Sequence, residues 1–180
     1  MPSAEVEGQV TLLLDGRRRR PALGRAMASL MEAAALPDGV RLRPLTVDDE
    51  DEVARLAAEL GRSADPEQWR ARLEVSGYGR PVCWGVEVDG RLVGQVLGHV
   101  RGDDFGLSGD VAWLEVLGVL PAWQRRGLAR LLVEAFVEDS GSRGLSRVAT
   151  LVNLHDQPLR RFFRSLGFRQ SALLSMERRV

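Results

Sequence analysis

Hydrophobic and polar positions form a regular pattern from about residue 40 to the end of the chain. Alternating positions and short apolar runs predict strands over residues 40–45, 82–88, 91–100, 111–119, 147–152 and 173–178. Apolar positions at helical spacing predict helices over residues 46–60, 66–73, 126–138 and 157–166. Asp89-Gly90 separates two of the strands and is typical of a tight hairpin. We therefore expect a mixed α+β domain over residues 40–180.

Residues 1–39 differ from this pattern and are expected to form an appended arm. One face of a predicted helix in the arm carries Leu23, Met27, Leu30 and Met31. That face must pack either on the main domain or on a second subunit, and we expect a homodimer. The run Arg17–Arg20 lacks interleaved aromatic residues, which favours a solvated turn or an anion contact over a nucleic-acid site.

Composition narrows the classes of function. The 180 residues are 44% hydrophobic and carry 25 basic and 25 acidic side chains, so net charge favours neither nucleic acid nor an anionic membrane. Cys83 is the only cysteine, and we expect neither a disulfide nor a metal site. The early apolar run Val10–Leu14 is too short to span a membrane. We expect a cytoplasmic protein whose function lies in a small, specific site.

The most informative segment runs from the strand over 111–119 into the helix that follows it. The connection reads Gln124-Arg125-Arg126-Gly127-Leu128-Ala129. Gly127 leaves room for a ligand to approach the backbone, and a helix start offers unpaired N–H groups and a positive dipole end. Two arginines add charge beside it. This arrangement favours a pyrophosphate group.

This segment resembles the phosphate loop of the GNAT superfamily of acyl-CoA N-acyltransferases, which has the form Gln/Arg-x-x-Gly-x-Gly/Ala. Gln124, Gly127 and Ala129 match it. The stretch from Asp156 to Phe168 is similar to the helix that the family writes Asn-x-x-Ala-x-x-x-Tyr-x-x-x-Gly-Phe. The resemblance covers roughly residues 40–180.

The resemblance implies a GNAT-like fold, with a mostly antiparallel, splayed central sheet flanked by helices on both faces. It implies that acetyl-CoA is the co-substrate, without a metal, and that a small-molecule or peptide amine attacks the thioester directly. The implied cofactor-binding residues are Leu117, Gly118, Val119, Gln124, Arg125, Arg126, Gly127, Leu128, Ala129, Asp156 and Phe163.

Two positions depart from the family pattern. Asp156 stands where an asparagine is usual, and Phe163 stands where many members have a tyrosine that acts as general acid. Phe163 cannot donate a proton to the leaving thiolate. His99, His155 and Tyr78 are the other candidates for proton transfer, and for each histidine a structural role is the alternative.

Glu115 occupies the position where the family often has an acidic base. With Trp113, Leu117 and Val119 it is expected on one alternating strand face; the alternative is a carboxylate that faces solvent. A weak or water-relayed base favours an α-amine, whose pKa is about 7.7 to 8.0, over a lysine amine near about 10.4. Arg160, Arg161 and Arg164 are candidates for contact with an adenosine phosphate, with solvated arginines as the alternative.

Two other classes of function remain open from the sequence. The missing tyrosine at position 163 suits a non-catalytic acyl-CoA-binding or regulatory domain. The arm over residues 1–39 suits an interaction protein. Neither the acceptor nor the acyl chain length follows from the sequence.

Overall fold

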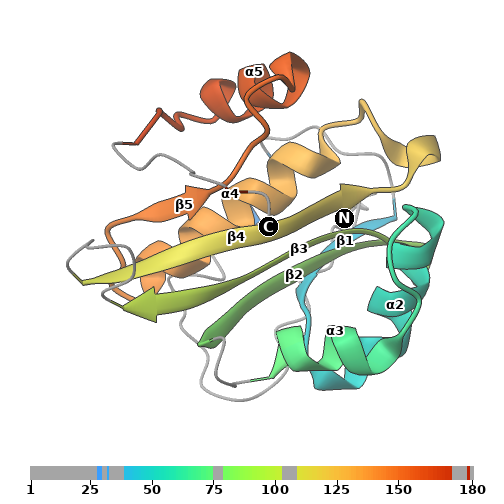
Figure 1. Ribbon diagram of the computed structural model, residues 1–180. Coiled ribbons are helices and arrows are strands. Elements are labelled where there is room, and N and C mark those ends of the chain that lie inside the picture. Colours follow the sequence, from blue (N-terminus) through green and yellow to red (C-terminus); the bar gives the residue numbers. More distant parts are fainter. Residues whose placement is uncertain are drawn as a thin grey trace, which may run out of the picture.

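The computed structural model describes residues 28, 29, 32, 39–74, 79–102, 109–171 and 178 (Figure 1). The apolar face predicted for the arm, Tyr78 and the strand predicted over 173–178, except Arg178, lie outside the described residues. In the described part of the chain, no helix has the length and apolar character needed to cross a membrane.

A single five-stranded sheet organises the described residues. Its strands follow the chain order: β1 (Val40–Pro44), β2 (Arg80–Val88), β3 (Arg91–Gly102), β4 (Asp110–Val119) and β5 (Val148–Thr150). Each of the first four pairs antiparallel with the next, and β5 pairs parallel with β4. The mixed, mostly antiparallel sheet expected from the sequence is confirmed.

The β2–β3 hairpin forms at the predicted dipeptide. Asp89 and Gly90 have φ angles of 50° and 76°, as a tight turn with two left-handed residues requires. The hairpin joins the two long central strands, which carry much of the buried apolar surface.

Helix α4 (Leu128–Ser142) covers one face of the sheet (Figure 1). A Cβ built on Gly94 would lie 3.1 Å from Leu132 Cδ1, and one built on Gly98 would lie 2.8 Å from the Phe136 ring. These contacts show how closely α4 approaches β3. The indole Nε1 of Trp84 donates to Asp139 at 3.1 Å, which adds a buried polar link between β2 and the helix.

The opposite face is covered by α2 (Glu50–Glu59) and α3 (Pro66–Leu73), after a short 3-10 turn over Val47–Asp49. A Cβ on Gly118 would lie 2.5 Å from Leu60 Cδ1, at the end of α2. On α3, the Arg72 carbonyl accepts a hydrogen bond from the Cys83 thiol at 3.7 Å. Helices therefore flank both faces of the sheet, as expected.

The helix starts follow from local hydrogen bonds. The Asp65 carboxylate accepts from the Glu67 N–H at 3.1 Å at the start of α3. The predicted start of α4 at Arg126 is wrong by two residues. Gly127 adopts a φ of 83° and forms the N-cap, so Arg125 and Arg126 belong to the preceding loop.

Strand β5 is shorter than the predicted strand over 147–152. It pairs with β4 only through Ala112–Val148, Trp113–Ala149 and Leu114–Thr150. The Thr150 hydroxyl closes this pairing by donating to the Leu114 carbonyl at 2.9 Å. Beyond Leu114 the two strands separate, which is the predicted splay. Helix α5 (Gln157–Ser165) follows in the chain.

The close approach of α4 to β3 can be tested at Gly98. A Cβ there would lie 2.0 Å from the Trp113 carbonyl oxygen, so Gly98→Ala should destabilise the fold by about 1–3 kcal/mol through overpacking. Gly141→Ala is the matched control, because it lies in α4 with no atom within 4 Å of its Cβ position. The control should be neutral or stabilising in urea unfolding. Equal stability of Gly98→Ala and wild type would contradict this packing.

Candidate active site

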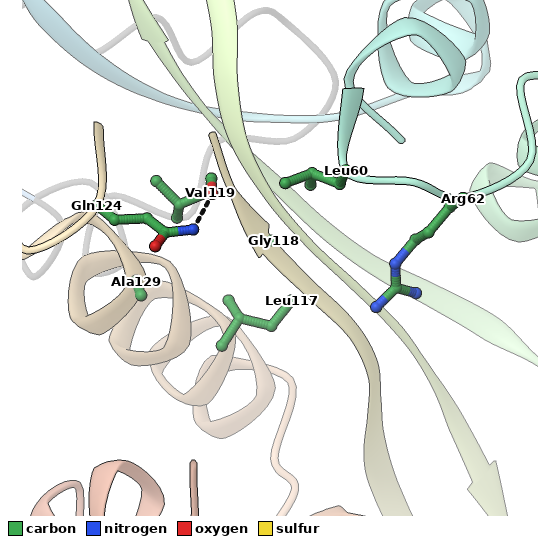
Figure 2. Close-up of a pocket in the computed structure, with 7 residues that line it drawn as sticks. All are labelled: Leu60, Arg62, Leu117, Gly118, Val119, Gln124 and Ala129. Atoms are coloured by element: carbon green, nitrogen blue, oxygen red, sulfur yellow. Dashed lines mark hydrogen bonds between the residues drawn. The ribbon is translucent and has the colours of Figure 1, made fainter. Parts of the chain in front are cut away.

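A cleft of about 310 Å³ lies along the second half of β4, beyond the residues that pair with β5 (Figure 2). It is lined by Leu60, Arg62, Leu117, Gly118, Val119, Gln124 and Ala129. Leu60 and Arg62 follow α2, whereas Ala129 lies in the first turn of α4. The cleft therefore reaches both faces of the sheet across the free edge of β4.

The loop that enters α4 is built from unusual backbone conformations. Arg125 has a φ of 64° and Gly127 a φ of 83°, and no side chain caps the helix start. The first N–H groups of a helix have no partner inside the helix, so here they remain available to an anionic ligand. Arg126 lies over the Trp123 ring at 4.8 Å, which holds one guanidinium beside this helix start.

Gln124 fastens this loop to the end of β4. Its side-chain Nε2 donates to the Val119 carbonyl oxygen at 2.9 Å, as the dashed line in Figure 2 shows. This bond satisfies one backbone acceptor at the end of the strand. Gln124 thus shapes the cleft as well as lining it.

The structure brings most of the predicted cofactor-binding residues together. Leu117, Gly118, Val119, Gln124 and Ala129 line the cleft, and Arg125, Arg126 and Gly127 are exposed in the adjoining loop. The side chain of Leu128 is buried in the core, with 1% exposure, so only its backbone can face a ligand.

Asp156 and Phe163 do not line the cleft. The Asp156 carboxylate caps α5 by accepting from the Leu159 N–H at 2.9 Å. Phe163 is buried between Phe162 and Phe168, with ring centroids 5.3 and 5.1 Å away in edge-to-face contacts. Both side chains therefore have structural roles in the arrangement described here.

A β-bulge places Glu115. Leu97 pairs with Val116 and Gly98 pairs with Leu114, so Glu115 is an extra residue in β4. The bulge breaks the alternation that the sequence suggested. Glu115 faces the α3 side, whereas Leu117 and Val119 lie on the α4 side of the strand, so the expected shared face is wrong.

Two guanidinium groups hold the Glu115 carboxylate. Arg72 Nη1 donates to Oε2 at 2.8 Å, and Arg101 Nη2 donates to Oε1. The side chain keeps 20% of its surface exposed. Burial of Glu115 acts to raise its pKa, but the hydrogen bond to His99 and the charges of Arg101 and Arg72 outweigh it and lower the pKa below its ordinary value of 4.5.

The other candidates for proton transfer differ in exposure. His99 is fully buried, with Nδ1 3.5 Å from Glu115 Oε2, so it supports the carboxylate from inside the sheet. His155 is exposed in the turn before α5. Of the arginines assigned to a phosphate, Arg160 donates to the Leu154 carbonyl at 3.1 Å, and Arg161 and Arg164 are exposed.

Several polar residues at or near the cleft were not singled out from the sequence. Arg62 lines the cleft, and Arg72 and Arg101 contact Glu115 on the α3 side of β4, but the three arginines come from separate parts of the chain and share no sequence motif. Gln95 pairs with Gly118 across the strands, is fully buried, and has no side-chain hydrogen bond to any described residue. The one signal in the sequence that could have identified Gln95 is its position as a polar residue inside an apolar run.

A second hollow of about 420 Å³ lies between the end of α4, β5 and the segment after α5. None of the predicted cofactor-binding residues lines it. The loop motif and the free edge of β4 meet only at the first cleft among the residues that the structure describes.

Comparison with known proteins shows the family of this chain. Residues 49–168 match the family described as the acetyltransferase (GNAT) family. A mycothiol acetyltransferase of Thermobispora bispora is 33% identical over 91% of the chain, and one of Thermomonospora curvata is 32% identical over 96%. The chain spans only 56% and 57% of the length of these two relatives.

Solved structures share the fold at lower identity. An aminoglycoside N-acetyltransferase in complex with CoA is 20% identical, with a TM-score of 0.66 over 78% of this chain and 94% of its own. A ribosomal-protein-alanine N-acetyltransferase from Brucella melitensis is 20% identical, with a TM-score of 0.62 over 78% of this chain and 99% of its own.

The low pKa of Glu115 makes stability depend on pH. The Glu115 carboxylate binds a proton less tightly in the folded state than in the unfolded chain. Its contribution to the free energy of unfolding is therefore present above about pH 4.5 and is lost as the pH falls through the folded-state pKa. Urea unfolding should show wild type about 1–2 kcal/mol more stable than Glu115→Gln at pH 7. The difference should shrink below pH 4.5, and a difference independent of pH would refute the ion cluster.

Proposed function

Because the chain belongs to the GNAT acetyltransferase family, we propose that it transfers an acetyl group from acetyl-CoA to a primary amine. The observation that carries the proposal is the cleft, where an uncapped helix start meets the free edge of β4. The names of the relatives, which include mycothiol and aminoglycoside acetyltransferases, support a small-molecule amine as acceptor.

The cofactor would lie along the cleft from α4 to the free edge of β4. The backbone N–H groups of Gly127, Leu128 and Ala129 and the guanidinium groups of Arg125 and Arg126 suit its pyrophosphate. The pantetheine arm would follow Leu117–Val119, where the β4 backbone has no β5 partner. A backbone N–H there can also stabilise negative charge that develops on the thioester oxygen.

The reaction is a direct acyl transfer. The amine nitrogen forms a bond to the thioester carbon, the carbon–sulfur bond breaks, the amine loses a proton and the thiolate leaves. Positioning of the amine against the thioester supplies much of the acceleration. The leaving thiolate takes a proton from water or from the amine that has attacked, because Phe163 carries no hydroxyl group.

Glu115 would accept the amine proton through water. A carboxylate held by Arg72 and Arg101, with a lowered pKa, is a weak base, but it stays ionised throughout the neutral range and can orient a water molecule. This favours acceptors whose amine has a sizeable unprotonated fraction near neutral pH, such as α-amines with a pKa of about 7.7 to 8.0, over amines with a pKa of about 10.4.

A non-catalytic acyl-CoA-binding role is the second candidate. It is favoured by one observation, the burial of Phe163 in an aromatic cluster where many relatives would offer a tyrosine hydroxyl. Measuring CoA release with a panel of amines, beside calorimetric titration of acetyl-CoA, separates the two. Turnover supports the transferase, and binding without turnover supports the second candidate.

The cofactor site can be tested at Gly127. Gly127→Asp should abolish acetyl-CoA binding, because it places a negative charge at the helix start that would face the pyrophosphate. The protein itself leaves room, with no atom within 4 Å of a Cβ built there, so the fold should persist. Gly127→Asn is the matched control, since asparagine has nearly the same shape, tolerates a positive φ and adds no charge. An unchanged dissociation constant in Gly127→Asp would refute the site.

The role of Glu115 can be tested with Glu115→Gln. This change should lower kcat by roughly 10²-fold while leaving acetyl-CoA affinity nearly unchanged. The loss should be smaller for acceptors with a lower amine pKa. Because Glu115 is ionised well below neutral pH, the pH dependence of wild type above pH 6 should follow the acceptor amine. Wild-type activity in Glu115→Gln with all amines would remove Glu115 from the mechanism.

A further inference from the structure

A cluster of charged side chains lies beside the cleft, on the side of β4 that faces α3. Glu115 brings one negative charge, and Arg72 and Arg101 both contact it, so these three side chains together carry a formal charge of +1. The side chains of Arg72 and Arg101 are 40% and 31% exposed, whereas that of Glu115 is 20% exposed. The two cations are thus more accessible to a ligand than the anion between them.

Arg62 adds a second positive group to the same side. It lines the cleft two residues after Leu60, and it forms no ion pair with any residue that the structure describes. Figure 2 shows its guanidinium group on the side of β4 opposite to Ala129 and α4. Arg62 is therefore separated by the strand from the helix start proposed to hold the pyrophosphate, and it faces the space from which an acceptor would approach the thioester.

The acidic residues on α2 and α3 have basic partners of their own. Glu59, at the end of α2, pairs with Arg91 at 2.7 Å, and Glu50 and Glu74 both pair with Arg70. Among the described residues, the lining of the cleft contains no carboxylate at all. A polycationic acceptor would meet repulsion here, whereas an acceptor that carries an anionic group would find a guanidinium without a competing partner.

We propose that the acceptor is an amine that also carries a carboxylate, and that Arg62 determines this specificity by binding the carboxylate. The inference rests on the proposed acetyl transfer and names its substrate class. With the carboxylate at Arg62, the amine lies toward Leu117 and Gly118, where the thioester is proposed to be exposed. Glu115 lies three residues from Gly118 along β4, about 10 Å away, which leaves room for the water that relays the proton.

The test compares α-amino acids with their own carboxamides as acceptors. The carboxamide lacks the negative charge, which lowers its amine pKa and favours its free-amine form, so basicity alone would make the carboxamide the better acceptor. A charge-assisted contact with Arg62 should reverse this order and give the acid about tenfold higher kcat/KM.

Arg62→Gln should bring the two acceptor classes to similar kcat/KM by raising KM for the acids, with kcat retained and the carboxamides unaffected. Arg55→Gln is the matched control, because Arg55 is exposed on α2 and does not line the cleft. The control should keep the wild-type preference. Equal use of acids and carboxamides by wild type, or an equal loss for both in Arg62→Gln, would overturn the inference while leaving acetyl transfer intact.

Failure of the proposed function gives a different result. If no amine is acetylated, acetyl transfer fails, and the anion site is then judged by titrating an N-acetylated amino acid into protein saturated with CoA. Binding that weakens about tenfold in Arg62→Gln and persists in Arg55→Gln would support the carboxylate site on its own. Absence of binding to wild type would overturn it as well.

Discussion

The early end of the pairing between β4 and β5 is the constraint on which the candidate site depends. Backbone N–H and C=O groups inside a protein need partners, and a sheet normally supplies them along the whole length of a strand. Here the pairing stops at Leu114, so the second half of β4 has a free edge. The loop before α4 closes part of the gap, and Gln124 satisfies the Val119 carbonyl. The remaining edge lines the cleft.

The bulge at Glu115 determines which side chains of β4 face α4 and which face α2 and α3. Before the bulge, Leu114 faces α4; after it, Gly118 faces Leu60 at the end of α2, and Leu117 and Val119 lie toward α4. The carboxylate itself reaches Arg72 and Arg101 on the α3 side. The strand thus presents apolar side chains toward α4 and a charged cluster toward α3 within a few residues of the bulge.

Much of the fold could be predicted from the sequence because its signals are local. Alternation located the strands, Asp89-Gly90 located the hairpin, and Asp65 located the start of α3. The loop motif over Gln124–Ala129 could be recognised for the same reason, since its glycine and its arginines are contiguous in the sequence. The end of β5 and the start of α4 were misplaced because strand separation and the left-handed Gly127 depend on tertiary geometry.

The arginines at the cleft and around Glu115 could not be predicted in the same way. Arg62, Arg72 and Arg101 come from the end of α2, from α3 and from β3, and only the packing of these elements brings them to one face. The alternation rule also misled the interpretation of Glu115, because a bulge leaves no mark in a pattern of apolar and polar residues. Its partners determine whether this carboxylate is basic, and those partners are distant in sequence.

The bulge also limits how this segment can change during evolution. Substitutions along β4 alter one side chain at a time, and each is tolerated or rejected where it stands. While the bulge is kept, loss of a single codon between Val116 and Val119 would instead shift the register by one residue and move every later side chain to the opposite face. Val119 would then take the place of Gly118, where a Cβ lies 2.5 Å from Leu60 Cδ1. A change in the length of this strand is therefore expected to disturb the cleft more than the substitution of one of its side chains.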